Sequence, residues 1–202
     1  MVLISDSGVK IPAPIPKLGG EEGKKLGGEE GKKLVDFPYI SQTQSQWCWA
    51  AVMLMIFAFN DTNSSEEQCS LSNKAFDKSS CCKSPSSSLC NKPLPVAQIS
   101  SEWRAHGYNS AYKSGSLSFQ EIILEIENSR AIEVGVKWSK GATGGHAILL
   151  TGWEKDTDGS EWVQIHDPNL EKGIVFIKFS KLLSNYGANV GRWLWSWSGI
   201  KE

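Results

Sequence analysis

Three residues, Cys48, His146 and Asp167, have the side chains that nucleophilic acyl chemistry requires. Cys48 lies between two tryptophans at the start of the apolar run 47–59. If that run is a helix, the unpaired N–H groups and the dipole of its first turn favour a thiolate, which is the reactive form of cysteine. A buried core cysteine is the other interpretation of this stretch, because free cysteines are often buried.

A thiolate nucleophile needs a base that forms an ion pair with it and later protonates the leaving group. The chain has three histidines. His106 falls near the end of a predicted helix and is interpreted as a surface or C-terminal cap residue. His146 opens a predicted strand, and His166 lies near the end of the next one. We expect Gly141, Gly144 and Gly145 to let a substrate backbone approach His146 closely.

The two strands that carry these histidines flank the turn "KDTDGS" and predict a hairpin. If His146 lies opposite Asp167, the hairpin is centred between residues 156 and 157, inside that turn. His146 and Asp167 then share one face, and His166 points to the other. A bulge would alter this register. Asn169 has the parity of Asp167, but Pro168 is expected to end the strand before it.

The elements that position these residues fall into two groups. Three helices are predicted first: the apolar run 47–59, the stretch 94–107, and 118–130 with capping-box spacing at Ser118 and Glu121. Short β-branched runs follow, which predict strands over 131–138, 146–154, 161–167, 174–179 and 192–198. Helices before strands indicate the α+β class, with a helical layer that carries the nucleophile packed on a C-terminal antiparallel sheet.

The chain divides into a tail, residues 1–34, and one folded domain, residues 35–202. The tail is rich in proline, glycine and charge, and the octad "KLGGEEGK" occurs in it twice, so it is predicted to be a flexible linker. The "LGG" before acidic residues also resembles a double-glycine leader site. Cleavage near Gly20 or Gly28, by the enzyme itself or by a leader peptidase, is therefore a further prediction.

Four of the five cysteines gather in a polar, serine-rich segment, as Cys69, Cys81, Cys82 and Cys90. This segment is too long for an unsupported loop, which favours disulfides, although their connectivity stays open. A zinc site is the alternative, but the spacing has no clean pair of C-x-x-C arms. We expect no metal and no cofactor.

Composition excludes several other classes of protein. The net charge is −1 and the pI about 6.3, and the lysines form no patch for nucleic acid beyond the tail. The longest apolar run, 47–59, is shorter than the roughly 20 residues of a membrane span. The N-terminus has no Sec-type signal pattern. We expect a monomer.

The motifs "QTQSQWCWAA", "GGHAILLTGW" and "VQIHDPN" resemble papain-like cysteine peptidases. They are most similar to a compact bacterial branch of effector proteases and bacteriocin-processing peptidases. The resemblance covers about residues 36–169. It departs from the plant and lysosomal enzymes, whose cysteine signature is absent here and whose histidine lies roughly 130 residues downstream, against 146 − 48 = 98 here.

The resemblance implies a role for each motif residue. Cys48 would be the nucleophile, His146 the general base and acid, and Asp167 the orienting residue. Gln42, six residues before the cysteine, would donate to the oxyanion, whereas Gln44 and Gln46 would not. Disulfides among the four clustered cysteines are also implied. The residues expected around the substrate are Trp47, Trp49, Gly144 and Gly145.

The expected function is hydrolysis of a protein or peptide substrate through an acyl-enzyme. Two other functions stay open: acyl transfer or deamidation by the same triad, as in transglutaminases, and an inactive binding or toxin module of the same fold. The disulfides favour a secreted protein or one delivered outside the producing cell, without a Sec signal, and a cytoplasmic location is the alternative.

Overall fold

The computed structural model describes residues 30–60, 65–139 and 144–202. Its helices are α1 (Cys48–Asn60), α2 (Gln68–Phe76), α3 (Val96–Ala105), α4 (Phe119–Glu127) and α5 (Phe179–Ser184). Its strands are β1 (Glu30–Lys33), β2 (Asn109–Ser114), β3 (Ile132–Lys137), β4 (Gly145–Lys155), β5 (Glu161–Asp167), β6 (Gly173–Lys178) and β7 (Arg192–Lys201). The predicted α+β class is confirmed.

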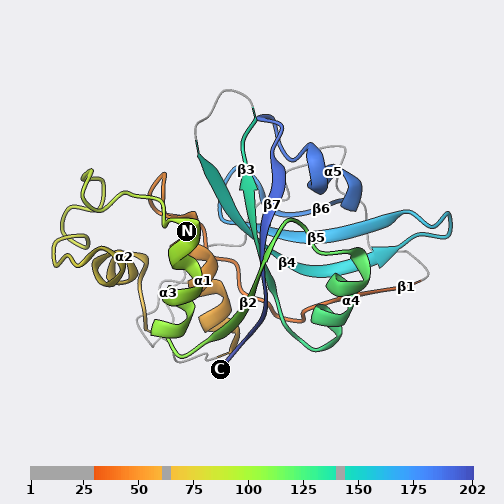
Figure 1. Ribbon diagram of the computed structural model, residues 1–202, viewed down its shortest axis with the longest axis horizontal. Coiled ribbons are helices and arrows are strands. Elements are labelled where there is room, and N and C mark those ends of the chain that lie inside the picture. Colours follow the sequence, from red (N-terminus) through yellow and green to blue (C-terminus); the bar gives the residue numbers. More distant parts are fainter. Residues whose placement is uncertain (1–29, 61–64, 140–143) are drawn as a thin grey trace, which may run out of the picture.

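The strands form one antiparallel sheet in the order β2-β7-β3-β4-β5-β6, with β1 added beside β4. In Figure 1 the helices α1, α2 and α3 lie on one side of the molecule and the sheet on the other, with α4 and α5 beside the strands. The three residues expected to do the chemistry therefore come from both halves, because Cys48 begins α1 while β4 and β5 carry His146 and Asp167.

Helix α1 is buried on all sides, as its unbroken apolar sequence predicts. Every residue from Trp49 to Phe57 is buried, and α1 packs against β4 of the sheet. This burial fixes the axis of the helix, so its first residue is held in a defined place beside the sheet. Within the described residues, no helix combines the length and apolar character needed to cross a membrane.

The predicted capping box at the start of α4 is confirmed. The hydroxyl of Ser118 accepts a hydrogen bond from the Glu121 N–H, and the Glu121 carboxylate accepts one from the Ser118 N–H.

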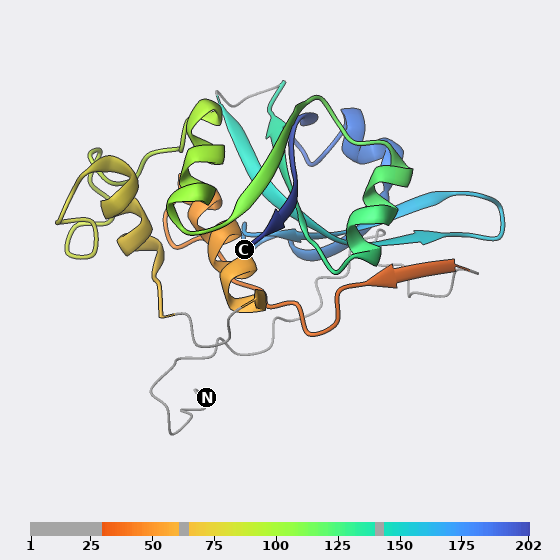
Figure 2. The ribbon, with the colours of Figure 1, turned by 60° about the horizontal axis from the view of Figure 1, so that its bottom comes forward.

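Four elements were not predicted from the sequence. These are α2 in the cysteine-rich segment, the polar strand β2, the short helix α5, and β1. Strand β1 pairs with the outer part of β4, so residues before the expected domain start at Val35 already belong to the sheet. Figure 2 shows β1 beside the β4–β5 hairpin. The linker prediction for residues 1–29, with the cleavage sites near Gly20 and Gly28, lies outside the described residues.

The β4–β5 register differs from the predicted one. Leu149 lies opposite His166, and a register shift between Leu150 and Gly152 separates this part from the outer part, where Lys155 lies opposite Glu161. By this register Ile148 lies opposite Asp167, so His146 is a diagonal neighbour of Asp167 rather than its direct partner. The predicted shared face survives, since a shift of two residues preserves the alternation of side chains.

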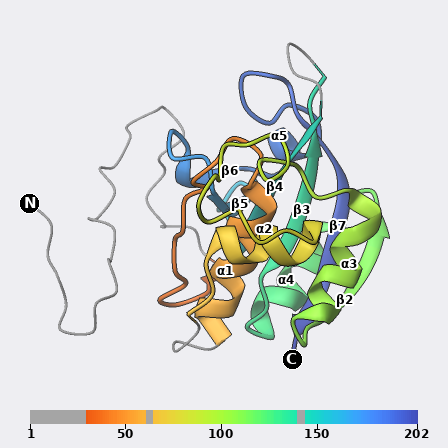
Figure 3. The same ribbon diagram turned by 90° about the vertical axis from the view of Figure 1, so that its left-hand side faces the viewer.

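The cysteine-rich segment is stapled by two disulfides, Cys69–Cys82 and Cys81–Cys90. Figure 3, viewed from the helical side, places α2 and the following loops in front of α1. Cys81 and Cys90 are fully buried in the core cluster, whereas Cys82 is exposed. The predicted disulfide frame is present, with this connectivity.

Candidate active site

Cys48 is the first residue of α1, and it is the one cysteine of the five that forms no disulfide. The carbonyl of Trp47 accepts the Ala51 N–H at 3.0 Å and thereby caps the helix. The N–H groups of the first helical turn have no intrahelical acceptors, so the positive end of the helix dipole lies at the thiol. Cys48 is partly exposed, which leaves its sulfur accessible.

His146 connects the cysteine to the aspartate. Its Nε2 lies 2.6 Å from Oδ1 of Asp167, and a hydrogen bond joins its ring to the sulfur of Cys48. Because Nε2 is occupied by Asp167, Nδ1 is the nitrogen left for the thiol. The structure therefore brings Cys48, His146 and Asp167 together in one contiguous chain of contacts.

The electrostatics favour a charged pair on these residues. Burial lowers the pKa of His146, but the charge and hydrogen bond of Asp167, together with those of Cys48, raise it overall to about 10. Burial raises the pKa of Asp167, but the His146 charge and three hydrogen bonds hold it below its usual value. An imidazolium paired with the Asp167 carboxylate is thus stabilised at neutral pH.

Gln42 is anchored beside this group, with its side chain turned toward its own loop. Its N–H donates to the Pro168 carbonyl at 2.8 Å, next to Asp167. Its Nε2 donates to the Gln44 carbonyl at 2.9 Å, and its Oε1 is buried with no hydrogen-bond partner within the described residues. One N–H of the amide is still free to donate, since an NH₂ group carries two.

A cavity of about 270 Å³ opens beside Cys48 and His146. Small residues of the sheet, Gly135 and Ala147, form part of its lining, and a side chain at position 135 would come within 2.9 Å of the Trp195 ring. The remaining lining is mostly apolar, from the segment before α3, from α3 and from β7: Pro93, Leu94, Pro95, Val96, Ile99, Trp195 and Trp197.

One carboxyl group, that of Glu133, borders this apolar cavity. It is almost fully buried and accepts a hydrogen bond from Trp103 Nε1 at 2.7 Å. Burial raises its pKa to about 8, against the opposing effect of the Trp103 hydrogen bond. The cavity is therefore free of a carboxylate charge at neutral pH, which suits an apolar ligand group.

Three of the four residues expected around the substrate do line the cavity: Trp49, Gly144 and Gly145. Gly144 has a φ of +111°, and a side chain at position 145 would come within 2.7 Å of the Val136 carbonyl oxygen. Gly141 lies outside the described residues. The expectation for Trp47 is wrong, because Trp47 is 1% exposed and does not line the cavity.

The remaining polar candidates lie elsewhere. His106 is the C-cap of α3, as expected, and bonds Glu102. His166 is buried on the other face of the hairpin, where its Nδ1 lies 2.8 Å from Thr151 Oγ1. Asn169 is exposed, and its side chain caps the following turn at Glu171 N.

Two residues of the site were missed from the sequence. The hydroxyl of Tyr186 donates to Oδ2 of Asp167 at 2.6 Å. The ring of Trp138 stacks on His146 at 5.8 Å and on Tyr186 at 6.4 Å between centroids. Neither belongs to a motif, and no spacing rule connects Tyr186, in a loop after α5, with a strand residue 19 positions earlier.

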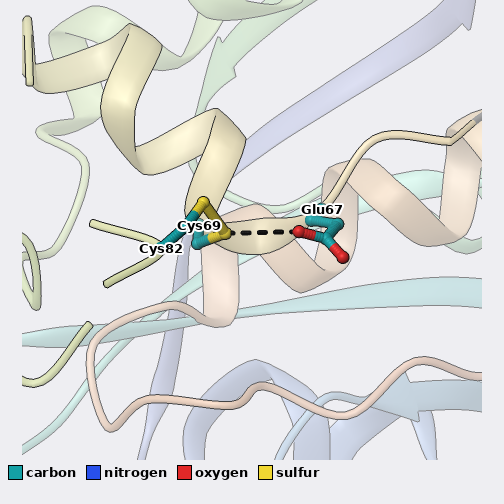
Figure 4. Close-up of side chains that lie close together, drawn as sticks. All are labelled: Glu67, Cys69 and Cys82. Atoms are coloured by element: carbon teal, nitrogen blue, oxygen red, sulfur yellow. Dashed lines mark hydrogen bonds between the residues drawn. A yellow bond between two sulfur atoms is a disulfide. The ribbon is translucent and has the colours of Figure 1, made fainter. Parts of the chain in front are cut away.

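The cysteine-rich segment does not form the alternative zinc site. Glu67, Cys69 and Cys82 do lie close together, as Figure 4 shows, and the Glu67 carboxylate is 3.4 Å from the Cys69 sulfur. The two sulfurs, however, are bonded to each other, as are those of Cys81 and Cys90. Zinc binds thiolates, so this group offers one carboxylate and no sulfur ligand.

Comparison with known proteins gives one family match. The sequence pattern described as "Peptidase_C39 like family" matches residues 34–192. No curated protein sequence matches the chain.

Several solved structures are similar to this one in fold. The proform of the ragweed pollen cysteine protease Amb a 11 has a TM-score of 0.50 at 10% identity, covering 90% of this chain and 61% of that one. The peptidase domain of Streptococcus ComA, a bifunctional ABC transporter of a quorum-sensing pathway, has a TM-score of 0.49 at 11% identity, covering 80% and 98%. A double-glycine-motif protease of an AMS/PCAT transporter, solved with its leader peptide, has a TM-score of 0.46 at 15% identity, covering 81% and 90%.

Proposed function

Because the chain belongs to the Peptidase_C39 like family and is a papain-like cysteine peptidase, we propose that it hydrolyses peptide bonds with the triad Cys48, His146 and Asp167. One observation carries this proposal: His146 is hydrogen-bonded to Cys48 at the start of α1 and, through Nε2, to the buried Asp167. The same three side chains supply a nucleophile, a base and an orienting group.

The proposed reaction runs through an acyl-enzyme. The Cys48 thiolate attacks the carbonyl carbon, and the His146 imidazolium gives its proton to the leaving amine as the C–N bond breaks. Water then attacks the thioester while His146 accepts its proton, which releases a carboxylic acid and restores the thiolate pair. Asp167 stays ionised throughout and orients the imidazole.

The apolar cavity supports an extension of this proposal to the substrate. A cavity of about 270 Å³ has room for one or two amino-acid side chains, and it adjoins the sulfur. Its lining and the uncharged Glu133 favour an uncharged, apolar side chain next to the scissile bond. We expect peptides with such a residue to be cleaved in preference to charged ones.

The direct test is covalent labelling together with product analysis. Wild-type protein should react with an epoxide-type cysteine probe at Cys48 and convert a defined peptide mixture into hydrolysed fragments at near-neutral pH. The variant Cys48→Ala should do neither, while keeping the wild-type circular dichroism spectrum. If an amine nucleophile is added to the mixture, fragments that carry this amine instead of a free carboxylate would favour acyl transfer. A wild type that neither labels nor cleaves would leave only a binding function.

Gln42→Ala is expected to reduce kcat by about 10²- to 10³-fold, the usual effect of removing one oxyanion donor, with little change in KM. The reason is that the amide stabilises charge that develops after binding. Gln46→Ala is the matched control, because Gln46 is exposed and its side chain is not needed for this role. Equal rates for both variants would assign the oxyanion site to other donors.

A further inference from the structure

The carboxylate of Asp167 has more partners than an orienting residue needs. Oδ1 accepts from Asn169 N–H at 2.8 Å and contacts His146 Nε2 at 2.6 Å. Oδ2 accepts from the hydroxyl of Tyr186 at 2.6 Å, and Asp167 and Tyr186 are 1% and 3% exposed. Both oxygens of a buried charge are therefore satisfied, and the second one depends on Tyr186.

The loop after α5 is built to hold Tyr186 in this place. The N–H of Tyr186 donates to the Gly191 carbonyl at 2.9 Å, and the N–H of Gly191 donates to the Tyr186 carbonyl at 2.8 Å. A side chain at position 191 would meet the Trp138 ring at 2.8 Å and a Val136 methyl at 2.4 Å. Glycine there lets the loop close on Trp138, which stacks on both Tyr186 and His146.

We propose that Tyr186 is a positioning residue of the reaction, which fixes the Asp167 carboxylate behind His146 and keeps it ionised. The inference rests on the proposed function, because it concerns the same triad. A phenol that donates to a buried carboxylate stabilises the charged form and restricts its rotation, so the imidazolium finds its acceptor already in place. The pKa of Asp167 is lowered in part by this hydrogen bond.

Other charged and titratable groups lie around the triad and around Tyr186. Cys48 lies beyond His146, and Tyr39 donates to the Asp167 backbone carbonyl at 3.0 Å. The ammonium of Lys172 lies 5.8 Å from the centre of the Tyr186 ring, and Lys172, Lys181 and Tyr186 line one surface pocket. Within the described residues, His146 and Tyr186 are the side chains that form hydrogen bonds with the Asp167 carboxylate.

The test is Tyr186→Phe, which removes one oxygen and keeps the ring. We expect kcat to fall roughly tenfold, the size of one hydrogen bond to a charged group, with KM within about twofold. The acid limb of activity should move to higher pH, because the pKa of Asp167 rises when its carboxylate loses the hydrogen bond from Tyr186. The rate of Cys48 alkylation by iodoacetamide against pH should show the same shift, and this measurement needs no substrate.

Tyr39→Phe is the matched control, since it removes a phenol that bonds the backbone of Asp167 and not its carboxylate. It should leave the acid limb unchanged, and equal pH profiles for the two variants would overturn the proposal. The double variant of Tyr186→Phe with Asp167→Asn is a second test: the effect of Tyr186→Phe should largely vanish there, and additive effects would contradict the proposal. A wild type that iodoacetamide does not alkylate at Cys48 would count against the proposed function instead.

Discussion

Replacing His146 with glutamine is expected to lower kcat/KM for peptide hydrolysis by about 10²- to 10⁴-fold, the range that general acid–base catalysis contributes. Glutamine can fill the space and contact Asp167, but it cannot carry a proton between sulfur, leaving amine and water. The variant should also lose the rapid alkylation of Cys48 by iodoacetamide at pH 6, because without an imidazolium the thiolate is no longer paired. Initial rates on a cleaved peptide and alkylation rates against pH measure both effects.

His166→Gln is the matched control, since His166 lies on the same hairpin and faces away from the site. Its turnover should stay within about threefold of wild type at pH 7. Burial lowers the pKa of His166 to about 4, against a raising effect from the Phe37 backbone. The unfolded chain therefore binds more protons than the folded one below pH 6.5, and wild-type stability falls as the pH drops toward 4. A large loss of turnover at pH 7 for this variant would show that His166, and not His146, acts as the base.

The sequence was sufficient to predict that Cys48, His146 and Asp167 lie together, because each of them has a strong local context. An apolar run of helical length with cysteine at its front predicts α1, and two β-branched runs around a polar turn predict the β4–β5 hairpin. Alternation along a strand is insensitive to a shift of two residues, so His146 and Asp167 meet although the predicted register was wrong. The prediction depends on which side chains share a face of the hairpin, and this does not require the exact pairing of residues.

The missed parts depend on contacts that local sequence does not encode. Tyr186 reaches Asp167 through a loop closed by its pairing with Gly191, which has no periodic signal. Strand β2 is polar and almost wholly exposed, and it exists because β7 offers it a free edge. Trp47 was expected to lie beside the substrate, but a tryptophan next to a nucleophile can equally be buried in the core, as Trp47 is.

The burial of Trp47 also explains how the cysteine-rich segment serves the site. Trp47 Nε1 donates to the Cys90 carbonyl at 2.8 Å, and Trp49 Nε1 donates to the Lys92 carbonyl at 3.1 Å. Asn91 accepts the Gln46 N–H at 2.9 Å through its side-chain oxygen. Both neighbours of Cys48 and its preceding loop are thus held by residues 90–92, which the buried Cys81–Cys90 disulfide fixes in place.

Removing this disulfide with Cys81→Ser and Cys90→Ser is expected to reduce kcat/KM more than tenfold, since the ends of α1 and of the Gln42 loop lose their support. The matched control is the pair Cys69→Ser and Cys82→Ser, whose bridge is nearer the surface and does not include Cys90, the residue whose carbonyl accepts from Trp47. Sequence separations of 9 and 13 give the two bridges similar chain-entropy contributions, roughly 3 kcal/mol each. A measurement of stability alone therefore cannot distinguish the two double variants, so their kcat/KM values must be compared.

Reductant should consequently act in two opposed ways on the wild type. Mild reductant keeps the Cys48 thiol free and raises activity, while stronger reductant opens Cys81–Cys90 and lowers it, so activity should pass through a maximum. In the Cys69→Ser and Cys82→Ser variant the maximum should persist, because the bridge that supports the nucleophile is intact. In the Cys81→Ser and Cys90→Ser variant the falling limb should disappear. A wild type whose activity rises steadily with dithiothreitol, with both bridges reduced by mass spectrometry, would show that the nucleophile is held without them.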